Sequence, residues 1–342
     1  MTEDARQGLF VGTYARLGGP GLVRIDERGP SSPRHGEAVP QIANASYHAH
    51  SRRFDVHYFV DEEAGNILAY RYDRGHWLLL RSVTSGGQEP CFVALDPEER
   101  QLAVANYGDG SLALVALDPV HGLPEGPPRI HRQQGSGPDP DRQEGPHVHC
   151  ARFSRDGRWL LISDLGSDQV IAFDMHESGL DHALPVFAAP PGSGPRHVLF
   201  SASGERLLLL SELASSLTLF DVKADGLVPT QTVSTLPGPV ACDTLGGHLA
   251  LNAAGTRVYV SNRGHDSISA FRIDEDGLAL LQNVPSGGQS PRHFLLLETT
   301  GELVVAHEES GTVSRLHLRE NGLLDEPDDK IEIAGAVFLL AV

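Results

Sequence analysis

This sequence predicts an all-β fold: a single seven-bladed β-propeller that spans residues 1–342, with its ring closed by the two ends of the chain. Three observations predict it. One strand–turn–strand phrase recurs along nearly the whole chain, its spacing suits a four-stranded blade, and the first and last segments each resemble part of a repeat. The length could hold two average domains, but large all-β folds often use it as one domain.

The recurring phrase is a short apolar run, a polar turn with Asp, Glu or Asn, and an alternating strand that ends near an acidic residue. Six segments follow this plan: 57–73, 101–118, 158–175, 205–222, 256–274 and 302–318. Their turns are 45–58 residues apart, and alternation within each run indicates strands. No convincing amphipathic helix interrupts the series. We expect residues 119–145, rich in Gly, Pro and charge, to form an extended loop.

The two ends of the chain account for the seventh blade. Residues 9–26 resemble the second half of a repeat, and residues 330–342 could supply the missing strand. Pairing the two segments in one blade would close the ring and remove the exposed sheet edge. An open β-solenoid or two sandwiches is the alternative.

The charge balance limits the partners. The chain has 45 Asp and Glu against 27 Lys and Arg, a formal net charge of −18. This field repels phosphate backbones and anionic lipids, so we expect neither nucleic acid nor a membrane as a partner. A small anionic substrate is disfavoured too, unless basic residues are concentrated in one cleft.

The cysteines and the first residues of the chain indicate where in the cell the protein is located. Cys91, Cys150 and Cys242 are odd in number and far apart, which favours reduced thiols over a disulfide framework or a zinc knuckle. The first residues lack the features of a signal peptide, and no apolar run is long enough for a membrane span. We therefore expect a cytoplasmic location.

Each repeat begins with a distinctive phrase ahead of its innermost strand. The phrases lie at residues 44–50, 88–95, 145–153, 194–200 and 290–296. In a blade of four antiparallel strands, the start of the first strand and the end of the second lie on one face of the disc. The phrases and the turns after the second strands should therefore meet at one mouth of the central channel.

The residues predicted to meet there are cationic with one central carboxylate. They are His147, His149, Arg196, His197, Glu212, Arg263, His265, Arg292 and His293, with Tyr14, Asn106, Arg142, Gln143, Glu144 and Asp164 as neighbours. A cationic patch in an acidic protein focuses an anionic ligand on the mouth. Glu212 could act as a general base among these cations. Any single His or Arg could instead satisfy backbone carbonyls or pair with an acidic neighbour.

Other kinds of site are disfavoured. The Gly-rich stretches are not followed by a helix, so a nucleotide-binding loop is unsupported. There is no GxSxG elbow and no cysteine beside an obvious base, which favours activated water over covalent catalysis. His147 and His149 point the same way on a strand, as metal ligands often do, but no local motif fixes a third ligand. We expect neither a metal nor a cofactor at the active site.

Several of these segments resemble the propeller-type lactonases, the family of the bacterial 6-phosphogluconolactonase of β-propeller fold and the fungal carboxymuconate cyclase. The most specific are RQEGPHVHCARFSRDGRWL (142–160), SDLGSDQV (163–170), GPRHVLF (194–200), VSNRGHDSISAFRID (260–274) and PRHFLL (291–296). The resemblance covers almost all of the chain and implies hydrolysis or formation of a lactone without a nucleotide cofactor. It points to His149 or His147, Arg196, Glu212 and Arg263. The chain departs from the family at GGHLALN (246–252), where His248 lies near a usual Glu, and at residues 44–59.

The function that we predict is hydrolysis of a sugar-acid lactone, with 6-phosphogluconolactone as the expected substrate. Glu212 would be the general base, and His149 the proton donor or oxyanion stabiliser. Arg196 and Arg263 would hold the carbonyl oxygen or the anionic group of the substrate. The further binding candidates are His147, Arg292, His197, His265, His293 and Arg142. The alternatives are a lactonase or cyclase acting on a muconate-like dicarboxylate, and a non-catalytic binding scaffold.

Overall fold

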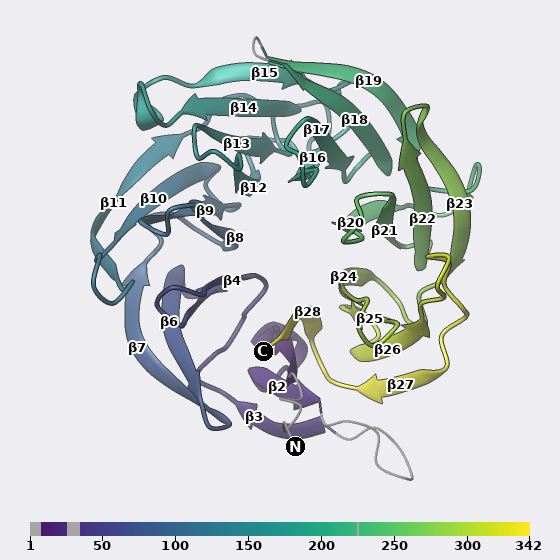
Figure 1. Ribbon diagram of the computed structural model, residues 1–342, viewed down its shortest axis with the longest axis horizontal. Helices are drawn as coiled ribbons and strands as arrows, with labels where there is room; N and C mark the ends of the chain where they lie inside the picture. The colour runs from purple at the N-terminus through teal and green to yellow at the C-terminus, as the bar shows by residue number, and fades with distance from the viewer. Residues whose placement is uncertain (1–7, 26–34, 224–225) are drawn as a thin grey trace.

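The computed structural model describes residues 8–25, 35–223 and 226–342, which form seven four-stranded antiparallel sheets around a central axis (Figure 1). We number the blades from the first full repeat. In blades 1–6 the strands follow one another outward from the axis, and blade 7 combines β28 with the first three strands.

The first three blades follow the repeats in order. Blade 1 contains β4 (His48–Ser51), β5 (Val56–Asp61), β6 (Asn66–Asp73) and β7 (His76–Thr84). Blade 2 contains β8 (Pro90–Leu95), β9 (Gln101–Asn106), β10 (Ser111–Leu117) and β11 (Pro124–Arg132). Blade 3 contains β12 (Val148–Phe153), β13 (Trp159–Asp164), β14 (Gln169–Asp174) and β15 (Leu184–Ala188).

The next three blades repeat the plan. Blade 4 contains β16 (Pro195–Phe200), β17 (Arg206–Ser211), β18 (Ser216–Lys223) and β19 (Gly226–Ser234). Blade 5 contains β20 (Leu245–Leu251), β21 (Arg257–Arg263), β22 (Ser267–Asp274) and β23 (Gly277–Pro285). Blade 6 contains β24 (Pro291–Leu297), β25 (Glu302–His307), β26 (Thr312–His317) and β27 (Asp329–Glu332). Two short 3-10 helices, η1 (Ala15–Leu17) and η2 (Gly179–Asp181), are the only helical segments among the described residues.

Blade 7 closes the ring as predicted. It contains β28 (Ala336–Ala341), β1 (Leu9–Thr13), β2 (Leu22–Ile25) and β3 (His35–Val39). The last strand pairs antiparallel with the first, from Leu9 opposite Ala341 to Thr13 opposite Ala336. Figure 1 shows the C-terminal β28 inside β2 and β3, nearest the axis. The two ends of the chain therefore close the ring within blade 7.

Two boundaries differ from the sequence prediction. The segment 330–342 is divided, because residues 329–332 form β27 at the outer edge of blade 6 and only 336–341 join blade 7. The predicted loop 119–145 contains β11, a nine-residue strand with three prolines. Since β11 pairs with β10 alone, it is an edge strand, where proline is tolerated.

A β-bulge recurs where the innermost strand begins, and it aims one side chain per blade at the axis. In five blades the register skips one residue of this strand: Cys91, His149, Arg196, Arg292 and Val337. All five line a narrow cavity on the axis. Bulges re-aim side chains and are frequent beside active sites. The repeat itself thus delivers side chains from separate blades to one point.

The cysteines and the helices agree with the sequence expectations. Cys91 and Cys150 are buried, Cys242 is exposed, and none of the three forms a disulfide. Within the described ranges, no helix has the length and apolar character needed to cross a bilayer.

Candidate active site

Glu212 is the centre of the cluster that the sequence predicted. Its side chain is 2% exposed, and Oε2 lies 2.8 Å from Arg196 Nε and 2.8 Å from Arg263 Nη2. Oε1 lies 2.5 Å from Nη2 of Arg142. His149 Nε2 is 4.0 Å from Oε2. Three guanidinium groups and one imidazole, from four separate parts of the chain, therefore surround one carboxylate.

Local structure explains how the cluster forms. Arg196 is the bulged residue at the start of β16, and Glu212 follows the end of the antiparallel β17, so both lie at one end of blade 4. The backbone N–H of Glu212 donates to the carbonyl of Gly194 at 2.7 Å, which fixes the turn. Arg263 ends β21 in blade 5, and His149 is the bulged residue of β12 in blade 3.

The charges in this cluster control its protonation. Burial alone would raise the pKa of Glu212, but the positive charges of Arg263 and Arg196 outweigh burial and hold that pKa well below its usual value. Burial lowers the pKa of His149 well below its usual value, and the charge of Arg196 lowers it further. At neutral pH the site thus contains an ionised carboxylate and a neutral imidazole. The neutral ring can donate a hydrogen bond without carrying a charge.

A second network lies beside the first, in blades 6, 7 and 1. Arg292 Nη1 is 3.1 Å from Glu308 Oε2, and Arg292 Nη2 donates to the hydroxyl of Tyr14 at 2.8 Å. That hydroxyl donates to Glu62 Oε2 at 2.6 Å. Arg16 also contacts Glu308, at 3.1 Å. The predicted neighbour Tyr14 thus links Arg292 to Glu62, and Glu308 binds Arg292 directly.

An open cavity adjoins both networks. It has a volume of about 920 Å³, and its walls include Arg16, Arg263 and Glu308. Arg263 belongs to the Glu212 cluster, and the other two belong to the second network. A small ligand in this cavity could reach charged groups from both.

Aromatic and histidine rings close the channel next to Arg196. Successive ring centroids lie 3.9–5.7 Å apart around a closed circuit formed by Tyr47, Phe92, His197, His248, His293 and Phe338. Burial lowers the pKa of His293 to about 3, with Arg196 adding to the effect. Burial also lowers the pKa values of His197 and His248 well below their usual range. These rings are neutral at neutral pH and form an uncharged plug.

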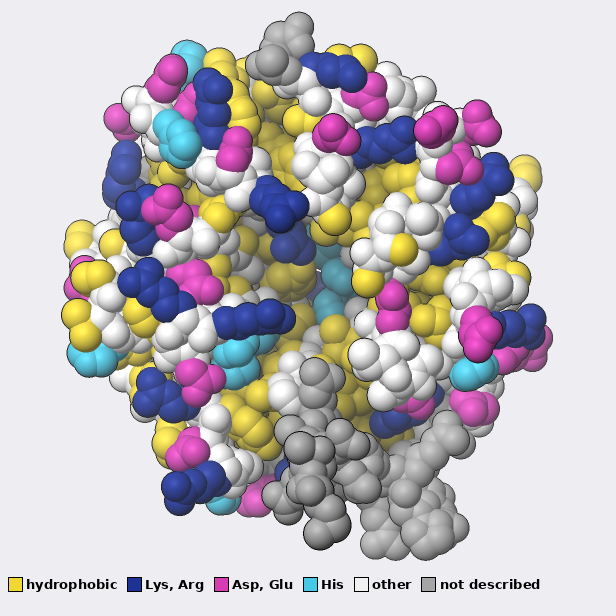
Figure 2. All heavy atoms as spheres, viewed as in Figure 1, with side chains coloured by type: hydrophobic (Ala, Val, Ile, Leu, Met, Phe, Trp, Pro, Cys, Tyr) yellow, Lys and Arg dark blue, Asp and Glu magenta, His cyan; other side chains and the backbone are white. Residues whose placement is uncertain are grey.

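His197 and His293 were predicted to bind substrate, and the structure places both in this plug. A further cavity, of about 670 Å³, is lined by Arg152 together with His248 and His293 of the plug. Figure 2 looks along the axis into a central hollow with hydrophobic walls, where histidine side chains are visible.

Other predicted residues have structural partners. His147 stacks on Tyr107 at 4.4 Å between ring centroids, and its Nδ1 lies 2.9 Å from the carbonyl oxygen of Tyr107. Its Nε2 is 3.3 Å from Glu144. His149 meets the same Tyr107 ring edge-on, at 5.5 Å between centroids, and points at Glu212 instead, so the two histidines do not form the ligand pair that their alternation suggested. His265 contacts Ser267 in its own turn.

The remaining predicted neighbours are buried and bind the backbone or nearby side chains. Asp164 accepts from the backbone N–H of His147, and Gln143 donates to the carbonyl of Leu165. Asn106 donates to the hydroxyl of Ser111. These three groups support the loops of the mouth without entering the Glu212 cluster.

Sequence reasoning missed Glu62, Tyr107 and Glu308. The backbone N–H groups of Tyr107 and Glu308 donate to the carbonyl just before the first strand of their blade, as that of Glu212 does, and the N–H of Glu62 donates to Asn44, four residues before β4. They are therefore equivalents of Glu212. In these blades a polar residue that ends the second strand, Asp61, Asn106 or His307, stands one position before the equivalent of Glu212. Aligning the turns on Glu212 would have found them.

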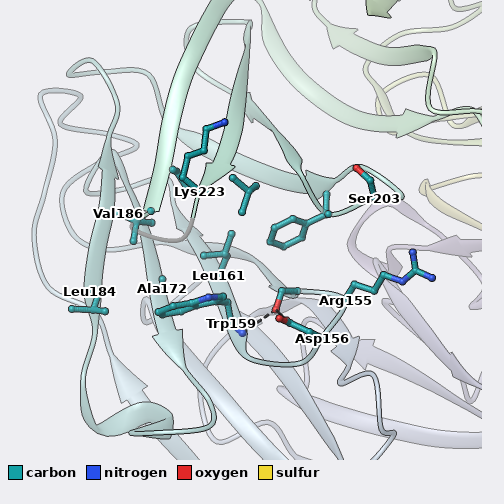
Figure 3. A pocket seen from close by; sticks show the side chains of 15 residues that line it. Arg155, Asp156, Trp159, Leu161, Ala172, Leu184, Val186, Ser203 and Lys223 are labelled. Carbon is teal, nitrogen blue, oxygen red and sulfur yellow. Dashed lines mark hydrogen bonds between the residues drawn. The ribbon is translucent and has the colours of Figure 1, made fainter. Parts of the chain in front are cut away.

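Another pocket, between blades 3 and 4, differs in character. Figure 3 shows Trp159, Leu161, Ala172, Leu184 and Val186 of blade 3 on its walls, with Ser203 and Lys223 of blade 4 opposite. No residue of the Glu212 cluster lines it. Its walls are mainly apolar, and its charged residues, Arg155, Asp156 and Lys223, do not surround a buried carboxylate as the arginines around Glu212 do.

Comparisons with known proteins agree with the fold. A family model described as "Lactonase, 7-bladed beta-propeller" matches residues 8–341. A 6-phosphogluconolactonase from Bacillus subtilis (strain 168) is 28% identical over 316 residues, which cover 89% of each chain.

Solved structures also match this chain over nearly its whole length. A Bacteroides fragilis protein provisionally assigned as a 6-phosphogluconolactonase has a TM-score of 0.88 and 26% identity, covering 100% of this chain and 99% of its own. The periplasmic gluconolactonase PpgL of Pseudomonas aeruginosa has a TM-score of 0.87 and 27% identity, covering 98% and 99%.

Proposed function

The chain belongs to the lactonase family of seven-bladed β-propellers, and we propose that the lactone it hydrolyses is 6-phosphogluconolactone, giving 6-phosphogluconate. The observation that carries this proposal is the concentration of arginine at one mouth of a protein whose net charge is −18. Arg142, Arg196 and Arg263 contact Glu212, and Arg16 and Arg292 contact Glu308. Guanidinium forks match the oxygens of phosphate and of a developing oxyanion.

In the proposed reaction, a water oxygen attacks the lactone carbonyl carbon and gives up a proton to Glu212. The new C–O bond produces a tetrahedral oxyanion, which Arg196 and Arg263 would stabilise. The C=O bond then re-forms as the ring C–O bond breaks, and the released ring oxygen takes up the proton from Glu212, which becomes a carboxylate again. The products are an open-chain hydroxy acid, which ionises, and one proton.

The environment of Glu212 supports its role as base and limits its strength. A carboxylate held ionised by two guanidinium groups is ready to accept a proton at neutral pH, but its low pKa makes it a weak base. His149 is neutral, so its N–H would stabilise the oxyanion by a hydrogen bond rather than by donating a full proton. Most of the rate gain would then come from preorganised positive charge.

The proposed binding roles follow from where each residue lies in the mouth of the channel. Arg292 and Arg142 would contact the phosphate or the hydroxyl groups of the sugar acid, since each reaches a group of the mouth. His147 precedes β12 in blade 3 and His265 lies in the β21–β22 turn of blade 5, and both would bound the site. His197 and His293 would form its floor. The cytoplasmic location remains a prediction, and the periplasmic gluconolactonase among the similar structures gives a reason to test it.

The test measures disappearance of 6-phosphogluconolactone and of unphosphorylated gluconolactone, each corrected for spontaneous hydrolysis. We expect kcat/KM to be at least about 10-fold higher for the phosphorylated lactone, because hydrogen bonds between charged groups contribute about 1.5–3 kcal/mol. Equal values, or a preference for the unphosphorylated lactone, would overturn the substrate. A muconate-derived lactone tests the dicarboxylate alternative, and absence of turnover with all three would favour a binding scaffold.

A further inference from the structure

Three histidines and one aspartate gather on blade 1, where β4 turns into β5. His48 and His50 alternate along β4 and so lie on one face of the sheet. His50 is directly opposite His57 of β5. Asp55 lies in the connecting turn, with φ of 54°. The strand pairs next to the corresponding turns of blades 2, 3 and 4 are Leu95–Leu102, Phe153–Leu160 and Phe200–Leu207, with no histidine. This cluster is therefore not a feature of the repeat.

The spacing of the cluster suits a metal ion. The ligand atoms of His50, Asp55 and His57 all lie within 4.8 Å of one another, the only such group among the described residues. Nε2 of His50 is 3.7 Å from Oδ1 of Asp55. Two nitrogens on a tetrahedral zinc ion lie about 3.4 Å apart, given Zn–N bonds of about 2.0–2.1 Å. The side chains of His50 and Asp55 are 34% and 65% exposed, so they can move to shorten the 3.7 Å separation to the distance that zinc needs. An ion can enter from solvent for the same reason.

His48 is placed to orient His57. Its Nε2 lies 2.9 Å from Nδ1 of His57, so one of the two nitrogens must donate to the other. When His57 Nδ1–H is the donor, the lone pair of His57 Nε2 is left for a metal. Histidine ligands usually donate their second ring N–H to an acceptor in this way.

The protonation states agree with that arrangement. Burial lowers the pKa of His57 to about 4, and the charge of His50 adds to the effect. Burial also lowers the pKa of His48 well below its usual value. Both rings are therefore neutral at neutral pH, which is the form that binds metals.

We propose that His50, His57 and Asp55 bind one divalent transition-metal ion, with His48 orienting His57. Two imidazole nitrogens and one carboxylate oxygen suit zinc. Arg71 Nε lies 4.0 Å from Oδ2 of Asp55, so the other oxygen, Oδ1, is free to face the ion. None of these residues contacts the Glu212 cluster. The ion would tie the β4–β5 turn together beside the closing blade, since the His48 ring lies 6.4 Å from that of Phe338.

The experiment titrates the chelator-treated full chain with zinc chloride, by calorimetry and by competition with a chromophoric chelator. We expect one equivalent to bind and the melting temperature to rise, because zinc would bind the folded state alone. His50→Ala and Asp55→Asn should each weaken binding at least about 10-fold. Asn tolerates the positive φ at position 55, and both residues are exposed, so neither change should impair folding.

His121→Ala is the matched control. His121 is exposed and forms a similar pair with the partly buried Asp118, at 3.3 Å. It should keep full zinc binding, and His50→Ala should keep lactone hydrolysis. Failure of the wild-type chain to bind one equivalent would overturn the proposal. So would equal affinity in His50→Ala, or loss of binding in His121→Ala.

Discussion

Blades 4 and 6 carry the same ion pair in two different environments. Arg196 and Arg292 are both the bulged residues of their innermost strands, and Glu212 and Glu308 both follow the second strands. Glu212 is 2% exposed and meets two further arginines from outside blade 4. Glu308 is 14% exposed and meets the exposed Arg16.

The arginines differ as well. Arg196 points at Glu212 with Nε and donates to the carbonyl of Gly247 with Nη1. Arg292 divides its donors between Glu308 and the hydroxyl of Tyr14. The repeat therefore fixes where an Arg–Glu pair lies, and the neighbouring blades decide what it can do. We expect the enclosed pair to serve the chemistry and the open pair to serve binding.

Replacing the two carboxylates tests this division most strongly. Glu212→Gln keeps the shape but removes the base, so kcat should fall by about 10²–10⁴-fold. Glu308→Gln should mainly raise KM and change kcat by less than about 10-fold. Both are measured with the preferred lactone after subtraction of spontaneous hydrolysis. Near-wild-type turnover of Glu212→Gln would mean that Glu212 only holds the arginines in place.

Replacing the two arginines should have the next largest effect on the kinetic constants. Arg196→Lys keeps the charge but loses the fork that would stabilise the oxyanion, so kcat should fall by about 10-fold or more. Arg292→Lys should raise KM for a phosphorylated lactone more than for the unphosphorylated one, if Arg292 binds the anionic group. Steady-state kinetics with both lactones separate the two. Identical profiles for the two variants would remove the distinction between the pairs.

The pH profile should respond to the arginines around Glu212. In the wild type the pKa of Glu212 is low, so the acid limb of kcat/KM should lie well below pH 4.5. Arg142→Gln removes a positive charge, which raises that pKa and moves the limb to higher pH by about 1 unit. Arg16→Gln, next to Glu308, should leave the limb in place. An unmoved limb in Arg142→Gln would show that a different group titrates.

Removing metal ions should have the smallest effect. The Glu212 cluster holds one carboxylate and one imidazole among three guanidinium cations, which is a poor set of metal ligands, so exhaustive chelation should leave kcat and KM unchanged. Loss of activity to a chelator and its restoration by one divalent ion would show that a metal acts in the mouth. It would also mean that arginine charge alone does not stabilise the oxyanion.

Much of the fold could be predicted from the sequence, because each blade repeats a local pattern. The alternating runs and their turns fixed the blade count, and the half-repeats at the two ends predicted the pairing of β1 with β28. Edge strands were harder to recognise. Residues 124–132 are rich in proline, a composition typical of a loop. They nevertheless form an edge strand, which pairs with a single neighbour, β10.

The sequence by itself determined that Arg196, Glu212, Arg263 and His149 meet, since strand alternation and the meander bring those positions to one mouth. Only the tertiary structure decided which neighbouring side chains enter the site. One bulge turns His149 toward Glu212 and leaves His147 on Tyr107, and the plug takes up His197 and His293. The tertiary structure also brings His50, Asp55 and His57 close together on blade 1. A bulge changes which way a side chain points without changing the alternation that the sequence displays.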